Sequence, residues 1–241
     1  METVEFLKIC DWNKIIKTKA HIFKEYLRKQ IGDRYYSLLE ELSKDVDIFI
    51  FSGIIKDYLL DIQEKPRDID FTFRGKPQRK WGKIIMENFE VTKNRFGGFK
   101  LRGRGSIDCD VWDIERTYGI TKRGLRLRPN DLLDMVFFNF TSIVYDFKSE
   151  RFIYDLRFLE FLRTMRMEVV NEKNPDIELC FVNIYHNFKK YGIEPGFSVI
   201  EWAKENYEES LWFRDVQQRH FHKELYTQVE LLNFISSKLL K

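Results

Sequence analysis

The amino-acid sequence predicts an α+β protein: a mixed β-sheet with flanking helices, followed by a mostly helical C-terminal region. Three patterns support this fold class. Apolar residues recur at helical spacing near the start, β-prone runs alternate with a short helical run in the middle, and helical spacing dominates from about residue 129. We therefore divide the 241 residues into a head over residues 1–150, with N-terminal helices, and a helical body over residues 151–241.

The first part of the head alternates between helical and β-prone patterns. Residues 12–44 are expected to be helical, because Ile16, Ala20, Phe23 and Leu27 recur at a spacing of three or four residues. The order predicted after them is a strand over residues 46–51, a helix over residues 53–61 and a strand over residues 68–74.

The rest of the chain is marked by proline and glycine. Pro77 favours a helix start, and a helix is expected to about residue 87. Short strands follow near residues 89–93, 98–103 and 106–113, with glycines as turn markers. In the body, a helix over Asp176–Tyr191 is closed by Gly192, and two amphipathic segments follow at residues 197–217 and 221–240.

Residues 52–70 carry the strongest chemical pattern. Ser52 and Gly53 follow an apolar strand, and their small side chains would let a triphosphate come close to the backbone. The helix expected after them presents free N–H groups at its N-terminus, which bind phosphate. Asp68 and Asp70 alternate on a strand, which places both carboxylates on one face with Cα atoms roughly 6.6 Å apart. Carboxylate oxygens suit hard divalent cations, and two such ions can activate an attacking oxygen and stabilise a leaving phosphate oxygen.

This stretch resembles the head of the tRNA nucleotidyltransferase and bacterial poly(A) polymerase family, within the DNA polymerase beta-like superfamily. In that family a strand, a Gly-Gly turn and a Val-Arg-Asp-x-Leu-Leu helix lead to an Asp-x-Asp strand. Here Ser52-Gly53 stands for the glycines, Ile55-Lys56-Asp57 for Val-Arg-Asp, and Leu59-Leu60 matches. The resemblance covers roughly residues 45–193 and implies the nucleotidyltransferase fold. It also implies that the protein binds a nucleoside triphosphate, with Ser52, Gly53 and Lys56 as contacts. Two Mg²⁺ ions are implied as cofactors, and Mn²⁺ could replace them.

A third carboxylate is expected on a neighbouring strand. In residues 106–113, apolar and acidic side chains alternate, and Asp110 in mid-strand is the preferred third ligand with Asp68 and Asp70. Asp108 remains the alternative, whereas Asp113 faces the other side by parity. Arg102 and Arg104 alternate on the preceding strand and could reach phosphate.

The resemblance weakens on the helix that corresponds to the neck of the family. The family's Glu-Asp-x-x-Arg, which selects the incoming base, falls on residues 176–180. Ile177 and Cys180 replace its aspartate and arginine, and neither side chain can make planar hydrogen bonds to a base edge. Addition of C, C and A is therefore not expected to carry over.

Composition and charge limit the partners and the compartment. Lysine and arginine number 41 against 38 acidic residues, but residues 93–128 hold ten basic and four acidic residues. A local basic zone beside an acidic centre suits a polyanion, so RNA is slightly favoured as acceptor. The three cysteines form no zinc pattern, and no apolar run approaches a membrane span, so we expect a cytoplasmic protein without membrane contact.

The sequence thus predicts a metal-dependent nucleotidyltransferase that moves a nucleoside monophosphate from a nucleoside triphosphate, such as ATP, to an acceptor hydroxyl. Alternative acceptors are a protein, a small molecule or another nucleotide, including roles in a toxin or defence system. A degenerate nucleotidyltransferase that only binds nucleic acid or protein is a second hypothesis, and a nuclease is a third. Pattern alone leaves the oligomeric state open.

Overall fold

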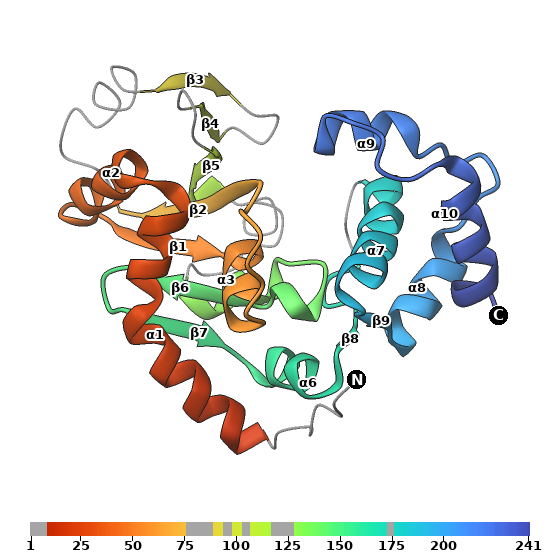
Figure 1. Ribbon diagram of the computed structural model, residues 1–241, viewed down its shortest axis with the longest axis horizontal. Coiled ribbons are helices and arrows are strands. Elements are labelled where there is room, and N and C mark those ends of the chain that lie inside the picture. Colours follow the sequence, from red (N-terminus) through yellow and green to blue (C-terminus); the bar gives the residue numbers. More distant parts are fainter. Residues whose placement is uncertain (1–8, 76–88, 94–97, 103–106, 117–127, 173–175) are drawn as a thin grey trace. The chain divides into compact units, whose positions relative to one another are not determined.

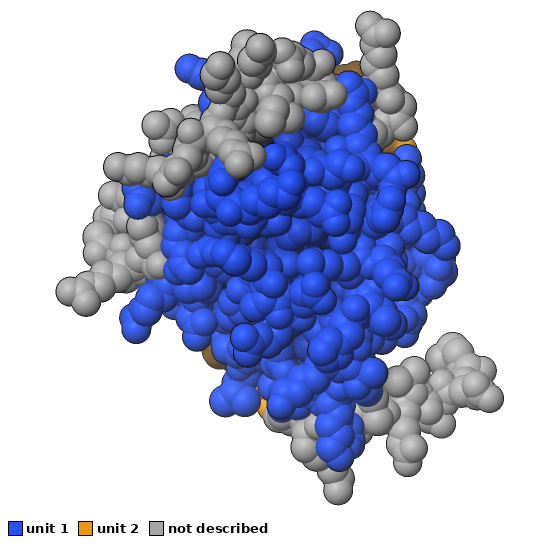
Figure 2. Space-filling model, turned by 90° about the vertical axis from the view of Figure 1, so that its left-hand side faces the viewer, with its two compact units in different colours: residues 1–135, 141–159 blue, residues 136–140, 160–241 orange. Residues whose placement is uncertain are grey.

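The structure, a computed structural model, describes residues 9–75, 89–93, 98–102, 107–116, 128–172 and 176–241 (Figure 1). The chain divides into two compact units, which Figure 2 distinguishes by colour. Unit 1 comprises residues 1–135 and 141–159, and unit 2 comprises residues 136–140 and 160–241. Unit 1 therefore continues beyond residue 150, where the sequence-based division ends the head.

Unit 1 is built on a mixed seven-stranded sheet, which confirms the predicted fold class. The strand order is β3-β4-β5-β2-β1-β6-β7, and every neighbouring pair is antiparallel except β2 with β5. The strands are β1 Asp47–Phe51, β2 Asp68–Arg74, β3 Glu90–Lys93, β4 Phe99–Arg102, β5 Asp108–Asp113, β6 Ile143–Asp146 and β7 Arg151–Tyr154.

Helices cover one face of this sheet. They are α1 Ile9–Ile31, α2 Asp33–Ser43 and α3 Ser52–Leu59 (Figure 1). The fully buried ring of Phe23 on α1 has its centroid 5.1 Å from Tyr58 of α3, 4.6 Å from Tyr145 of β6 and 5.1 Å from Phe152 of β7. The break between α1 and α2 falls at Gly32, whose φ of 81° favours glycine. The predicted helical run therefore folds as two helices packed on the sheet.

The opposite face carries both an apolar cluster and the acidic side chains. Phe49, Phe51 and Val144 pack there against Leu132 and Leu133 of the 3₁₀-helix Pro129–Asp134, with Ile114 of the 3₁₀-helix Ile114–Arg116. Phe49 pairs with Thr72, so β2 residues of the same parity, Asp68 and Asp70, share this face. The sheet therefore separates a helix-covered apolar face from a face with polar groups over β2 and β5.

The prediction that the chain is mostly helical from residue 129 is wrong for residues 143–154. These residues form the hairpin β6–β7, in which Ile143 pairs with Tyr154. The turn is closed by Asp146, whose Oδ1 accepts hydrogen bonds from the N–H groups of Lys148 and Ser149 at 3.0 and 3.1 Å. Apolar runs this short do not distinguish a strand from a buried helix segment, and pairing with β1 decides the outcome.

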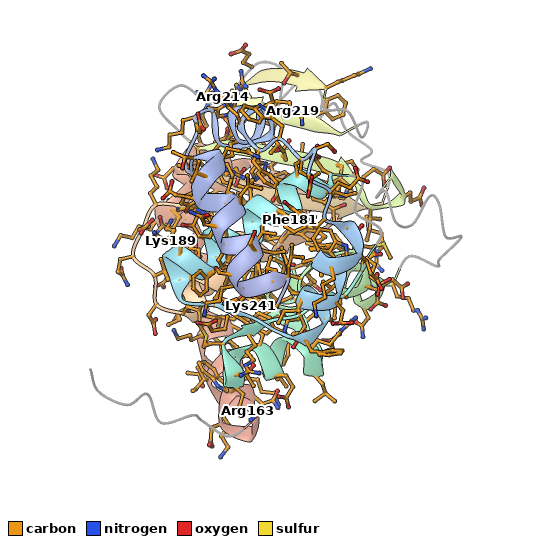
Figure 3. The ribbon with its side chains drawn as sticks, turned by 90° about the vertical axis from the view of Figure 1, so that its right-hand side faces the viewer. Arg163, Phe181, Lys189, Arg214, Arg219 and Lys241 are labelled. Carbon is orange, nitrogen blue, oxygen red and sulfur yellow. The ribbon has the colours of Figure 1, made fainter. Side chains whose placement is uncertain are left out.

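Unit 2 is helical, apart from the two-residue strands β8 Arg166–Met167 and β9 Glu194–Pro195 and an isolated bridge. Its complete helices are α7 Ile177–Tyr191, α8 Phe197–Asn206, α9 Arg214–Phe221, α10 Gln228–Phe234 and the π-helix Ile235–Leu239. It also contains the end of α6 Leu156–Thr164 and part of the 3₁₀-helix Asn139–Thr141. Phe181 of α7, labelled in Figure 3, is fully buried in this unit. Its ring centroid lies 5.1 Å from that of Trp202 and 6.1 Å from that of Phe213. Gly192 ends α7 in the left-handed conformation, as predicted.

Two helical segments that the sequence predicts remain to be compared with the structure. The amphipathic segment at residues 197–217 is divided between α8 and α9. The helix expected from Pro77 to about residue 87 lies outside the described residues. Among the residues that are described, no helix is both long and apolar enough to cross a bilayer.

Candidate active site

The parallel pairing of β2 with β5 gathers four carboxylates on one face of the sheet. Asp68 pairs with Asp108, and Asp70 pairs with Asp110. Adjacent strands lie about 4.8 Å apart and alternate residues roughly 6.6 Å apart, so the four Cα atoms form a compact rectangle. Both the preferred third acid and its alternative therefore belong to this face. Asp113 has the opposite parity, and its Oδ1 accepts the N–H of Glu115 at 3.0 Å.

Among the described residues, three basic side chains accompany these carboxylates. Arg67 donates two hydrogen bonds to Oδ2 of Asp68, from Nε at 2.9 Å and from Nη2 at 2.6 Å. On β4, Lys100 pairs with Asp110, and its Nζ lies 3.5 Å from Oδ2 of Asp108 and 3.6 Å from Oδ2 of Asp110. Nε of Arg102 lies 3.7 Å from Oδ2 of Asp108. The sequence pattern predicts Arg102 as a phosphate contact and gives no signal for Lys100, although the two residues alternate on one strand.

Asp70 is the electrostatic centre of this cluster. Burial, followed by the charges of Asp68 and Asp110, raises the pKa of Asp70 from 3.8 to about 8, and Arg67 and Lys100 only partly oppose the shift. The carboxyl group therefore retains its proton well above the usual range unless another positive charge joins the cluster.

The donor set suits Mg²⁺, although the carboxylates do not already converge on one point. Within the described parts of the chain, no three acidic, histidine or cysteine side chains are placed so that they could hold a metal ion. The carboxylates of Asp68 and Asp108 are instead turned toward basic partners. Four carboxyl groups on one face of the sheet nevertheless supply the oxygen ligands that a hard divalent cation favours.

The start of α3, which follows β1 directly, lies beside the beginning of β2. β1 pairs with β2, with Ile50 opposite Phe71, so Ser52 and Gly53 at the start of α3 adjoin the beginning of β2. Gly53 is exposed, and a Cβ atom added there would have no heavy atom within 4 Å. The protein itself therefore leaves open space at this glycine, as close approach of a ligand to the backbone would require.

We expect Gly53→Ala to leave folding intact and to weaken nucleotide binding. Alanine fits the open space and favours the helix by up to ~1 kcal/mol, so the melting temperature should not fall. If the triphosphate contacts this turn, the added methyl group should lower nucleotide affinity by about tenfold, the equivalent of one lost hydrogen bond. Calorimetric titration with nucleoside triphosphate and Mg²⁺ checks this; unchanged affinity with an unchanged melt would remove the turn from the binding site.

The side chain of Lys56, which the sequence predicts to contact phosphate, is buried in the structure. Its side chain is 6% exposed, and its Nζ lies 2.5 Å from Oδ1 of the neighbouring Asp57. The ammonium group is thus neutralised inside unit 1, and a phosphate contact by Lys56 stays a prediction. The side chain of Ser52 lies outside the described residues.

Much of the basic zone at residues 93–128 also lies outside the described residues, including Arg104. Its described members on β4, Lys100 and Arg102, are directed at the acids of β5. RNA binding by the zone therefore stays a prediction.

The residue that the sequence resemblance matches to the family's base-selecting arginine lies in the core of unit 2. Cys180 on α7 is 2% exposed, and burial raises the pKa of its thiol. Ile177, one turn earlier, is half-buried. A buried thiol and an aliphatic side chain offer no planar pair of donors and acceptors to a base.

Comparisons with known proteins show the fold. No protein-family model and no curated protein matches this sequence. A CCA-adding enzyme in complex with CTP matches with a TM-score of 0.62 and 12% identity over 88% of this chain and 53% of the other. The Thermotoga maritima CCA-adding enzyme complexed with tRNA matches with a TM-score of 0.61 and 12% identity, over 88% and 52%.

A third solved structure, a tRNA nucleotidyltransferase complexed with a primer tRNA and an incoming ATP analogue, has a TM-score of 0.51 and 15% identity over 70% of this chain and 48% of the other. The chain thus spans about half the length of the structures that it matches. Its unit 1 sheet and the helices that follow have a tRNA nucleotidyltransferase-like fold.

Proposed function

We propose that the protein is a Mg²⁺-dependent nucleotidyltransferase that moves a nucleoside monophosphate from a nucleoside triphosphate to an acceptor hydroxyl. The observation that carries the proposal is the β2–β5 register, which sets Asp68 and Asp70 beside Asp108 and Asp110 on the polar face of a nucleotidyltransferase-like sheet. The acceptor hydroxyl releases its proton to water and its oxygen forms a bond to the α-phosphorus. The bond between that phosphorus and the oxygen that bridges to the β-phosphate breaks, and pyrophosphate leaves.

Each group of residues has a distinct task in this proposal. Asp68, Asp70 and Asp110 would hold two divalent ions, which supply charge neutralisation at the phosphates and activate the acceptor oxygen. The N–H groups at the start of α3, at Ser52 and Gly53, bind phosphate oxygens. Arg102, which is exposed on β4, adds positive charge on the same face. Catalysis then rests on positioning and on preorganised charge.

RNA is the acceptor that we favour. The solved structures of similar fold include complexes with CTP, with ATP and with tRNA, and residues 93–128 are rich in basic side chains. A protein or small-molecule acceptor, a cytoplasmic location and a role in defence stay predictions. A binding module without activity is the second candidate, but the four carboxylates on one face favour an enzyme.

One assay tests both whether the protein transfers a nucleotide and which kind of molecule accepts it. The protein is incubated with each of the four α-labelled triphosphates and Mg²⁺, in parallel with total RNA, with total protein and with no acceptor. Label in RNA supports the favoured acceptor, and label in protein replaces it. Mg²⁺-dependent nucleotide binding without any transfer would support the binding module.

We expect no programmed addition of C, C and A. A site that hydrogen-bonds a base can reject a wrong group by orders of magnitude, whereas apolar walls discriminate by about 1–3 kcal/mol. With Ile177 and the buried Cys180 at the base-selecting positions, selection should be loose or set elsewhere. Incorporation from ATP, CTP, GTP and UTP onto a tRNA that lacks its 3′ end measures this, and faithful CCA synthesis would contradict it.

A further inference from the structure

Lys100 occupies a special position within the acidic cluster. It is the residue of β4 directly opposite Asp110, and its Nζ lies almost equally far from the Oδ2 atoms of Asp108 and Asp110, at 3.5 and 3.6 Å. The ammonium group therefore lies between the two β5 carboxylates, where the antiparallel pairing of β4 and β5 holds its backbone.

The charges of the cluster are unevenly compensated. On the β5 side, Lys100 and Arg102 face Asp108 and Asp110. On the β2 side, Arg67 hydrogen-bonds Asp68, and Asp70 pairs with Asp110 of β5. A first divalent cation is therefore expected at the β2 carboxylates, because a cation that approaches Asp110 meets the ammonium of Lys100.

We propose that Lys100 holds the place of the second divalent ion when no nucleotide is bound. Lys100 then leaves Asp110 when the metal–nucleotide complex arrives, and its ammonium pairs with phosphate oxygens. This inference rests on the proposed function, because it concerns how the same carboxylates are filled. It makes Lys100 a positioning residue that couples occupation of the second metal position to the presence of nucleotide.

The side chain is suited to such an exchange. Both Nζ–Oδ2 distances exceed those of a direct charge-assisted hydrogen bond, about 2.7–2.9 Å, so the ammonium is attracted to both carboxylates without being fixed to either. Lysine carries a compact charge on a flexible stem, and a quarter of this side chain is exposed. Arg102, on the same strand and with the same parity, contacts Asp108 alone among these acids and provides a matched comparison.

Titration with Mn²⁺, followed by electron paramagnetic resonance of the free ion, tests the proposal on the full chain. In the wild type we expect one ion bound without nucleotide, and a second only with a non-hydrolysable triphosphate analogue. Lys100→Gln should bind the second ion without nucleotide at least about tenfold more tightly, because a repelling charge has been removed. The same variant should bind the analogue more weakly. Lys100→Arg should retain the wild-type pattern, and Arg102→Gln should leave the second ion dependent on nucleotide.

The outcomes separate the two proposals. Two ions of similar affinity in the wild type without nucleotide would overturn the role of Lys100 and leave the metal site in place, as would identical second-ion affinity in Lys100→Gln and Arg102→Gln. If no Mn²⁺ binds with or without nucleotide, the proposed function itself fails. If Lys100→Gln does not fold, two ions of similar affinity in the wild type without nucleotide would still overturn the role of Lys100.

Discussion

Replacing Asp70 with asparagine will abolish nucleotidyl transfer and will raise the melting temperature of the metal-free protein at pH 8. Activity should fall by at least about two to three orders of magnitude, the effect typical of removing one group that stabilises transition-state charge. The asparagine side chain keeps the shape of the aspartate but lacks the anionic oxygens that a hard cation prefers. Asp68→Asn should lower activity to a similar extent.

The stability effect follows from the pKa of Asp70. This pKa is raised from 3.8 to about 8 in the folded protein, so between these pH values folding takes up a proton. The contribution of Asp70 to the free energy of unfolding of the wild type therefore falls as the pH rises from about 4 to about 8, and it stays low above pH 8. Asparagine does not ionise, so the variant's advantage should be small near pH 4 and largest at pH 8. Each kcal/mol gained corresponds to roughly 2–4 °C for a chain of this size.

Thermal melts at pH 5 and pH 8, with and without Mg²⁺, measure both halves of the prediction. Added Mg²⁺ should stabilise the wild type and leave Asp70→Asn nearly unchanged. Asp47→Asn is the matched control, since Asp47 lies on the neighbouring strand β1 and pairs with Arg74. This control should retain full activity. Full activity in Asp70→Asn would exclude the metal assignment.

The second large effect distinguishes the two acids of β5. Asp110→Ala should reduce transfer by orders of magnitude, and Asp108→Ala by about tenfold or less. Both lie on the polar face and both face Lys100, but Asp110 pairs with Asp70 and contributes to its raised pKa, whereas Asp108 also faces Arg102. Asp110 is therefore the acid of β5 directly opposite Asp70, with which it would share a metal ion.

Rates under single-turnover conditions, together with Mn²⁺ affinity, test this ranking. Alanine at either position removes one charge of the same sign from the same strand, so each variant is the control of the other. A larger loss in Asp108→Ala would show that the third ligand is one alternate position earlier on β5. Asp113→Ala should lose stability rather than metal affinity, because Asp113 accepts the N–H of Glu115 on the other side of the strand.

The elements with strong local patterns could be predicted from sequence. β1, α3 and β2 follow in the expected order within two residues of the predicted bounds. The common face of Asp68 and Asp70 follows from the two-residue period of a strand, whatever surrounds it. Likewise, Gly192 ends α7 because its left-handed conformation is available to glycine at little cost. Such features depend on a few adjacent residues, so the sequence determines them directly.

Other features depend on residues that are distant in the chain. Only the tertiary structure shows that β5 pairs with β2 in parallel, that β6–β7 extends the sheet, and that Lys100 lies between Asp108 and Asp110. It also places Lys56 inside unit 1 beside Asp57, where local pattern had suggested a phosphate contact. Strand order and register are set by burial of whole faces against one another, a long-range balance that no short stretch of sequence contains.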